Sequence, residues 1–161
     1  MAQIKIIFID CDGTLTSGHY YVSSEGSTIK GYNTRDFFAL KKIKKLGYRV
    51  IVLTGAKDGS IDVKCNQSEI ECLSNCQDKA TTIEKIIKGV HDWSEVAILG
   101  DAENDIESMQ LAGFSACPSD AIKEVIGICD YVSEYKGGDA VVYDIIRYIF
   151  ELEGIDWISN E

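Results

Sequence analysis

The chain has 161 residues, of which 45% are hydrophobic and 26% charged, and its formal net charge is −10. This length and composition are typical of one globular domain with a full core, so we expect a single domain over residues 1–161. The negative charge argues against binding to nucleic acid. No apolar run approaches the roughly 20 residues of a membrane span, and no signal peptide is visible, so we expect a cytoplasmic protein.

Apolar, β-rich runs alternate with helical patterns along the whole chain. Strand-like runs lie at 3–10, 48–55, 70–74, 95–101, 114–118 and 130–133, and helical patterns at 34–47, 57–68, 81–90, 104–112, 120–127 and 139–154. Repeated β-α-β order of this kind predicts an α/β fold. Specifically, we expect a Rossmann-like, doubly wound parallel sheet with helices on both faces.

Residues 18–33 interrupt this alternation. Two β-prone pieces, HYYV and STIKGY, flank a Ser-Ser-Glu-Gly turn, which predicts a projecting β-hairpin. An isolated two-stranded ribbon is marginal in water, so its apolar side chains should be buried against something. The candidates are the hairpins of other subunits and the chain's own crevice. The apolar side chains in question are Tyr20, Tyr21, Val22, Ile29 and Tyr32.

Polar signatures follow three of the predicted strands: DCDGT at 10–14, Thr54-Gly55, and GDAEND at 100–105. In a doubly wound sheet, ligands bind beyond the carboxyl ends of the strands, and parallel strands bring those ends to one edge. Carboxylates gathered there need a hard cation, and oxygen ligands suit Mg²⁺. The sequence therefore predicts a magnesium site at this edge.

The residue types in these signatures suit phosphoryl transfer. Asp10, held at a strand end, could attack phosphorus as a nucleophile. Asp12, pointing the same way along an extended backbone, could protonate the leaving oxygen and later activate water, and its carbonyl could reach the metal. Gly13 lets the turn bring amides close to a phosphate. Thr54 could donate a hydrogen bond to that phosphate, and Lys79 could offset the charge there.

Several other interpretations of these patterns are weaker. DxDG alone is often only a turn, and an EF-hand loop is excluded because its glycine falls at position six whereas Gly13 falls at position four. A receiver-type signalling domain would carry its phospho-acceptor on a central third strand, whereas Asp10 ends the first. The six cysteines form no CxxC pair and are expected to be reduced thiols. A zinc site would have to use Cys65, Cys72, Cys76 and His91, whose spacing fits no familiar pattern.

The ordered set DxDGT, TG, K and GDxxxD resembles the haloacid dehalogenase superfamily of phosphotransferases, and the resemblance covers almost the whole chain. It implies that Asp10 is the nucleophile that becomes an aspartyl-phosphate and that Asp12 is the general acid/base. It implies a phosphate site of Gly13, Thr54, Gly55 and Lys79. It also implies a Mg²⁺ site of Asp10, the Asp12 carbonyl and Asp101, with Asp105 supporting the metal from its second shell.

The short segments between these motifs leave no room for a large cap domain. Capless members of this size resemble the 3-deoxy-octulosonate 8-phosphate and nonulosonate 9-phosphate phosphatases. The similarity to that subgroup lies in Gly26, Lys30, residues 32–34, Asp36 and Gly137-Gly138. These relatives are tetramers, so the resemblance implies a homotetramer through the 18–33 hairpin, in which a neighbour's C-terminal segment helps cover each active site.

Three positions depart from that subgroup's pattern. Ala56 stands where the octulosonate enzymes have an arginine, Phe37 where glycine is common, and the tail GGDAVVYD is one residue short and lacks the usual arginine. We therefore expect a Mg²⁺-dependent phosphatase of a small phosphorylated sugar, with an acidic eight- or nine-carbon sugar favoured. The alternatives are a phosphatase of another small metabolite, or a non-catalytic domain that assembles or regulates a sugar-nucleotide synthesis partner.

Overall fold

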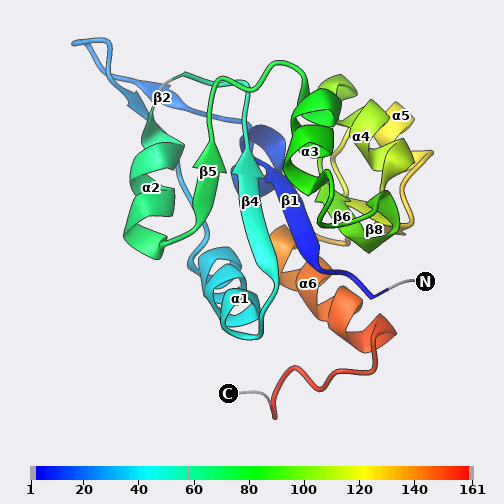
Figure 1. Cartoon of the computed structure of the whole chain (residues 1–161). Helices are drawn as coiled ribbons and strands as arrows, with labels where there is room; N and C mark the ends of the chain where they lie inside the picture. The colour runs from blue at the N-terminus through cyan, green and yellow to red at the C-terminus, as the bar shows by residue number, and fades with distance from the viewer. Residues whose placement is uncertain (1–2, 58, 160–161) are drawn as a thin grey trace.

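Parallel strands form one sheet in the computed structural model, which describes residues 3–57 and 59–159 (Figure 1). Over these residues the strand order is β5-β4-β1-β6-β7-β8. The strands are β1 (Ile6–Asp10), β4 (Arg49–Leu53), β5 (Glu71–Leu73), β6 (Val96–Leu99), β7 (Phe114–Cys117) and β8 (Tyr131–Val132). β1 is fully buried and lies between β4 and β6. The predicted parallel α/β fold without a large cap is confirmed.

Helices cover both faces of the sheet (Figure 1). One face carries α1 (Thr34–Lys45), α2 (Ser60–Ser68) and α6 (Val141–Leu152), and the other carries α3 (Lys79–Ile87), α4 (Ile106–Leu111) and α5 (Lys123–Ile126). Ile7 and Ile9 belong to the core beneath α1 and α6, whereas Ile6 and Phe8 belong to the core beneath α3. Because side chains alternate along a strand, Asp10 falls on the α3 face.

All six predicted helices differ from the observed ones by a few residues at their ends, and two of these differences concern the candidate site. α3 begins at Lys79, two residues earlier than expected, because the Asp78 side chain accepts the backbone N–H of Thr81 at 2.9 Å and caps the helix. The helix expected from residue 104 begins at Ile106, after a 3₁₀ turn over Glu103–Asp105. Both differences place an ionisable side chain at a helix start, and these side chains, Lys79 and Asp105, belong to the site described below.

The hairpin consists of β2 (Tyr21–Val22) and β3 (Thr28–Ile29), paired antiparallel with Tyr21 opposite Ile29. It projects from the domain beside α2 (Figure 1). Tyr21 is 75% exposed and Ile29 is 60% exposed. The predicted hairpin is confirmed, and within one chain these apolar side chains are not buried against the crevice.

Two further expectations concern the whole chain. All six cysteines are free thiols. Among the residues that the structure describes, no helix has the length and apolar character needed to cross a membrane.

Asp36, in the first turn of α1, is a fully buried carboxylate outside the candidate site. Its Oδ1 accepts the backbone N–H of Tyr143 at 2.8 Å, near the start of α6, while Oδ2 has no hydrogen-bond partner in the described part of the chain. Burial raises the pKa of Asp36 from 3.8 to about 6, although the N–H groups of Tyr143 and Val142 oppose the shift. The folded protein therefore holds this proton more tightly than the unfolded chain does. The protonated Asp36 carboxyl stabilises the fold at low pH, and this stabilisation is lost as the pH rises from about 4 to 6.

We expect Asp36→Asn to remove this pH dependence, because asparagine keeps the Oδ1 acceptor but carries no charge. The free energy of unfolding of the variant, relative to wild type, should rise by up to about 3 kcal/mol between pH 4 and pH 7. Urea unfolding at a series of pH values measures this difference. Asp62→Asn, at a half-buried residue of α2, is the matched control for the exchange of aspartate for asparagine. A curve for Asp36→Asn that runs parallel to that of wild type would contradict the assignment.

Candidate active site

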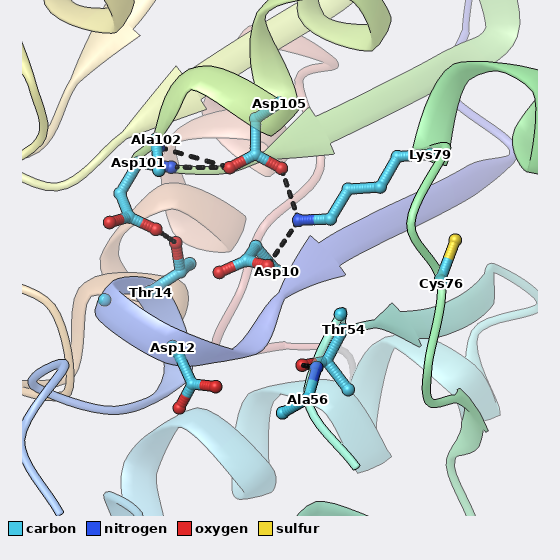
Figure 2. A network of polar contacts seen from close by, with 12 residues as sticks. Asp10, Asp12, Thr14, Thr54, Ala56, Cys76, Lys79, Asp101, Ala102 and Asp105 are labelled. Atoms are coloured by element: carbon cyan, nitrogen blue, oxygen red, sulfur yellow. Dashed lines mark hydrogen bonds and ion pairs between the residues drawn. The ribbon is translucent and has the colours of Figure 1, made fainter.

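Three carboxylates converge where β1 and β6 end. Asp10 lies opposite Leu53 of β4, and Ile9 lies opposite Leu99 of β6, so the residues that follow these strands meet at one edge of the sheet. Side-chain oxygens of Asp10, Asp101 and Asp105 lie within 4.8 Å of one another (Figure 2). The sequence-based prediction that these strand ends come together is confirmed.

Lys79, the first residue of α3, holds this cluster of carboxylates together. Its side chain is 3% exposed, and its ammonium contacts the Asp10 carboxylate and, at 2.6 Å, Oδ1 of Asp105. The other oxygen of Asp105 accepts the backbone N–H groups of Asp101 at 3.1 Å and Ala102 at 3.2 Å (Figure 2). Asp105 therefore ties the loop after β6 to the start of α3.

The charges in this cluster do not balance. Burial raises the pKa of Asp10 well above its usual value, with Asp105 and Asp101 adding to the shift and Lys79 opposing it. Burial and then Asp105 raise the pKa of Asp101 to about 6. Burial alone would lower the pKa of Lys79, but Asp10 and Asp105 outweigh it and raise that pKa.

Two buried carboxylates, Asp10 and Asp105, and the half-buried Asp101 thus share one ammonium, which leaves excess negative charge. A divalent cation would offset this excess, and a donor set made only of carboxylate oxygens suits a hard cation such as Mg²⁺. The residues present therefore fit the predicted metal. Among the described residues, this is also the one group of three or more His, Cys, Asp or Glu side chains close enough together to hold an ion. The zinc alternative, with Cys65, Cys72, Cys76 and His91 as ligands, does not form such a group within the part of the chain that the structure describes.

The loop after β1 packs directly on Asp101. Gly13 has φ +98°, and a Cβ at this position would lie 2.1 Å from Oδ2 of Asp101. The Thr14 hydroxyl donates to Oδ1 of Asp101 at 3.2 Å. The same loop contacts two glycines near the C-terminal helix. Gly138 donates its N–H to the Thr14 carbonyl at 2.9 Å, and a Cβ on Gly137 would collide with the Gly13 carbonyl. The Gly137-Gly138 pair therefore supports this loop within its own chain.

Gly13→Ala should be harmful for two reasons, the positive φ of this residue and the collision of the new methyl group with Asp101. Gly47→Ala shares only the first of these and serves as the control. Gly47 has φ +95°, but a Cβ there would meet nothing within 4 Å. Both variants should pay about 1–2 kcal/mol for a left-handed alanine. Only Gly13→Ala should also lose the phosphatase activity that the sequence predicts, because its methyl group displaces Asp101. Thermal unfolding and phosphate release measure the two effects, and equal activity in the two variants would contradict this interpretation.

Asp12 lies beyond the end of the strand. The chain turns over Cys11–Leu15, where Asp12 itself keeps a non-helical backbone (φ −86°, ψ 110°) and Gly13 has φ +98°. The Asp12 carboxylate lies outside the cluster of Asp10, Asp101 and Asp105 and contacts the ammonium of Lys30. Figure 2 shows Asp12 on the other side of the loop from Asp101.

Thr54 lies one residue beyond Leu53, the β4 partner of Asp10, and is buried. Its hydroxyl accepts the N–H of Ala56 at 3.1 Å, which shapes the turn after β4 (Figure 2). The Gly55 carbonyl accepts the Gln77 side chain at 3.1 Å. The structure thus brings Thr54 and Gly55 to the Asp10 edge, on the β4 side.

Thr14 and Lys30, which contact Asp101 and Asp12 respectively, are two site residues for which no role is expected from the sequence. Thr14 belongs to the DxDGT signature and could have been found from it. Lys30 is one of the positions that carry the subgroup resemblance, but it lies 18 residues from Asp12 in a hairpin, and nothing in the sequence pattern indicates that the two side chains meet.

The comparisons with known proteins agree with this geometry. Residues 59–145, more than half of the chain, match the haloacid dehalogenase-like hydrolase family. The chain is 29% identical to N-acylneuraminate cytidylyltransferase A of Danio rerio over 93% of its own length but only 36% of that protein. It therefore spans about a third of the length of the cytidylyltransferases it matches.

Two further relatives match over most of both chains. The chain is 26% identical to the 3-deoxy-D-manno-octulosonate 8-phosphate phosphatase KdsC of Yersinia pestis, over 98% of its length and 88% of that protein. It superposes with a TM-score of 0.88 and 25% identity on the corresponding phosphatase of Moraxella catarrhalis, solved with magnesium, phosphate and KDO, covering 92% and 86% of the two chains. With the family match over more than half of its residues, the chain belongs to the haloacid dehalogenase-like hydrolases.

Proposed function

We propose that the chain is a Mg²⁺-dependent phosphoric monoester hydrolase that works through an aspartyl-phosphate intermediate. The observation that carries this proposal is the buried Asp10 at the end of the central strand, held by Lys79 and flanked by Asp101 and Asp105. The similarity to KdsC over 88% of that protein supports it. So does the likeness to the Moraxella catarrhalis phosphatase, whose structure holds magnesium and phosphate.

In this proposal, Asp10, Asp101 and the Asp12 carbonyl would hold the metal. Asp105 would support the site by fixing the loop that carries Asp101. When bound, Mg²⁺ would neutralise charge on the phosphoryl group and keep Asp10 ionised in spite of its burial. Lys79 would offset the negative charge shared by Asp10 and the phosphate. Thr54 and the amides of Gly13 and Gly55 would bind the phosphate oxygens.

The chemistry then has two displacements at phosphorus. A carboxylate oxygen of Asp10 bonds to phosphorus while the bond to the leaving oxygen breaks, and Asp12 donates a proton to that oxygen. Asp12 next takes a proton from a water molecule. That water attacks phosphorus, the bond to Asp10 breaks, and inorganic phosphate is released.

We further propose that the substrate is a small phosphorylated sugar, with an acidic eight- or nine-carbon sugar favoured by the KdsC similarity. Ala56, directly after the Thr54-Gly55 turn, offers no charged group to a sugar carboxylate, so another part of the site would have to recognise it. Phosphate release from octulosonate and nonulosonate phosphates, neutral hexose phosphates and non-sugar monoesters tests this choice. We expect kcat/KM for an acidic sugar to be at least about tenfold higher, a difference of about 1.4 kcal/mol. Equal values across the panel would favour another small metabolite.

A second candidate function follows from the cytidylyltransferase similarity. The chain matches only 36% of that protein, so a domain like this one could assemble or regulate a sugar-nucleotide synthesis partner without catalysing hydrolysis. The complete set of Asp10, Asp12, Thr54, Lys79 and Asp101 argues against this candidate, because a non-catalytic domain does not need all five. Absence of phosphate release from every ester, together with co-elution with a cytidylyltransferase, would favour it.

We also propose that the chain forms a homotetramer through the 18–33 hairpin. Tyr20, Tyr21 and Ile29 are each at least 60% exposed in the single chain, so association of hairpins would bury these apolar side chains.

Replacing Tyr20, Tyr21 and Ile29 with serine should therefore convert a wild-type mass of about four times 17.8 kDa to the monomer mass in light scattering. Val90→Ser removes a 71% exposed apolar side chain after α3 and should leave the mass unchanged. A wild-type mass near that of one chain would defeat the proposal.

A further inference from the structure

A buried lysine connects the exposed hairpin to Asp12. Lys30 follows β3 directly, and its ammonium lies 2.7 Å from Oδ1 and 2.9 Å from Oδ2 of Asp12. The Lys30 side chain is only 3% exposed, whereas its neighbour Ile29 is 60% exposed. Burying an ammonium is unfavourable unless it is paired, so the contact with Asp12 accounts for the inward position of this side chain.

The Asp12 carboxylate depends on this contact for its position. The strand ladder that fixes Asp10 ends at the pair Asp10–Leu53, and Asp12 lies beyond it in the turn, before a glycine with positive φ. Its other side-chain contact is a hydrogen bond of 3.5 Å from the Thr16 hydroxyl. Two short contacts from Lys30 to both oxygens are therefore the stronger restraint. The Asp12 side chain is 39% exposed, so it remains open to the solvent edge of the site.

We infer that Lys30 is a positioning residue for the acid/base carboxylate of Asp12, and that through Lys30 the hairpin forms part of the active site. This inference rests on the proposed phosphatase function. A general acid or base must lie within hydrogen-bond reach of the proton it transfers, and a displacement of about 1 Å can cost about 10²-fold in rate. Lys30 restrains the carboxylate plane by contacting both oxygens, and no other element supplies a comparable contact among the described residues.

The test uses leaving groups that differ in their need for protonation. A sugar phosphate expels an alkoxide and needs a general acid, whereas para-nitrophenyl phosphate expels a stabilised phenolate and needs it much less. We expect Lys30→Met to lower kcat for the sugar phosphate by about 10- to 100-fold with little change in KM. The loss with para-nitrophenyl phosphate should be several-fold smaller. Lys30→Arg, which keeps a cation able to contact both oxygens, should recover part of the loss.

A double-mutant cycle separates positioning from a general structural effect. On para-nitrophenyl phosphate, the variant with both Lys30→Met and Asp12→Ala should be no slower than Asp12→Ala alone, because Lys30 then has nothing to position. Lys45→Met, on the exposed surface of α1, is the matched control and should behave as wild type. Light scattering should give Lys30→Met the wild-type mass, which excludes an effect through association. If Lys30→Met does not fold, Lys30→Gln takes its place.

Each outcome has a distinct meaning. Additive losses in the double variant, an equal loss with both substrates, or a wild-type kcat in Lys30→Met would overturn the inference while leaving the phosphatase function intact. A rise in KM alone would show instead that Lys30 binds substrate directly. A wild-type protein that hydrolyses neither ester would overturn the proposed function and the inference together.

Discussion

Asp10→Asn is expected to abolish turnover while the protein stays folded. Asparagine has nearly the same size as aspartate, but its neutral amide cannot attack phosphorus, so no aspartyl-phosphate can form. Loss of a nucleophile typically lowers kcat by about 10⁴- to 10⁶-fold. The fold should survive, because Lys79 keeps Asp105 as a partner at 2.6 Å when the charge on Asp10 is removed.

Phosphate release from para-nitrophenyl phosphate and from the best sugar phosphate measures the loss, and circular dichroism verifies the fold. Acid-quenched wild-type protein should carry a phosphoryl group on the peptide that contains Asp10, and Asp10→Asn should not. Asp62→Asn makes the same chemical change on α2, away from the site, and should retain full activity. Residual turnover of more than about a hundredth of wild type would contradict the covalent mechanism.

The sequence predicts most of this fold because the central strands are unambiguous. QIKIIFID is too short for a helix and too apolar for an edge strand, and it ends abruptly in charge. Similar polar endings at Thr54 and Asp101 mark the same edge, because all these strands run parallel. The convergence of Asp10, Thr54 and Asp101 follows from chain order and strand direction, whereas the supporting role of Asp105 is implied by the resemblance to the family, and Lys79 is identified from its charge before a helix and from the same resemblance.

The position of Asp12 could not be predicted in the same way. Strand periodicity fixes a side chain only while the ladder continues, and here it ends at Asp10. The partner of Asp12 comes from a hairpin whose strands, β2 and β3, do not pair with the six-stranded sheet, so no periodic pattern relates Lys30 to Asp12. Similarly, the collision that a Cβ on Gly13 would make with Asp101 depends on the folded loop and not on the motif.

Removal of divalent metal is the second change for which we expect a near-complete loss of activity. EDTA should stop phosphate release, and added Mg²⁺ should restore it, because Asp10 and Asp101 would otherwise repel the substrate phosphate. Asp105→Asn should raise the Mg²⁺ concentration needed for half-maximal activity by about 10- to 100-fold, since Asp105 orients the loop that carries Asp101. Full activity after exhaustive chelation would show that the metal assignment is wrong.

The same site predicts opposite effects of Asp101→Asn on stability with and without metal. Without metal at neutral pH, Asp101 is a half-buried carboxylate whose pKa is raised to about 6, first by desolvation and then by Asp105, so its ionised form destabilises the fold. Asp101→Asn should therefore melt at a higher temperature than wild type in EDTA. In saturating Mg²⁺, the wild type should gain about 2.7 kcal/mol at a hundredfold excess over Kd, and the variant should gain much less. Thermal unfolding in EDTA and in Mg²⁺ measures both effects without any assay of activity. An equal Mg²⁺ shift in the two proteins would show that Asp101 does not bind the ion.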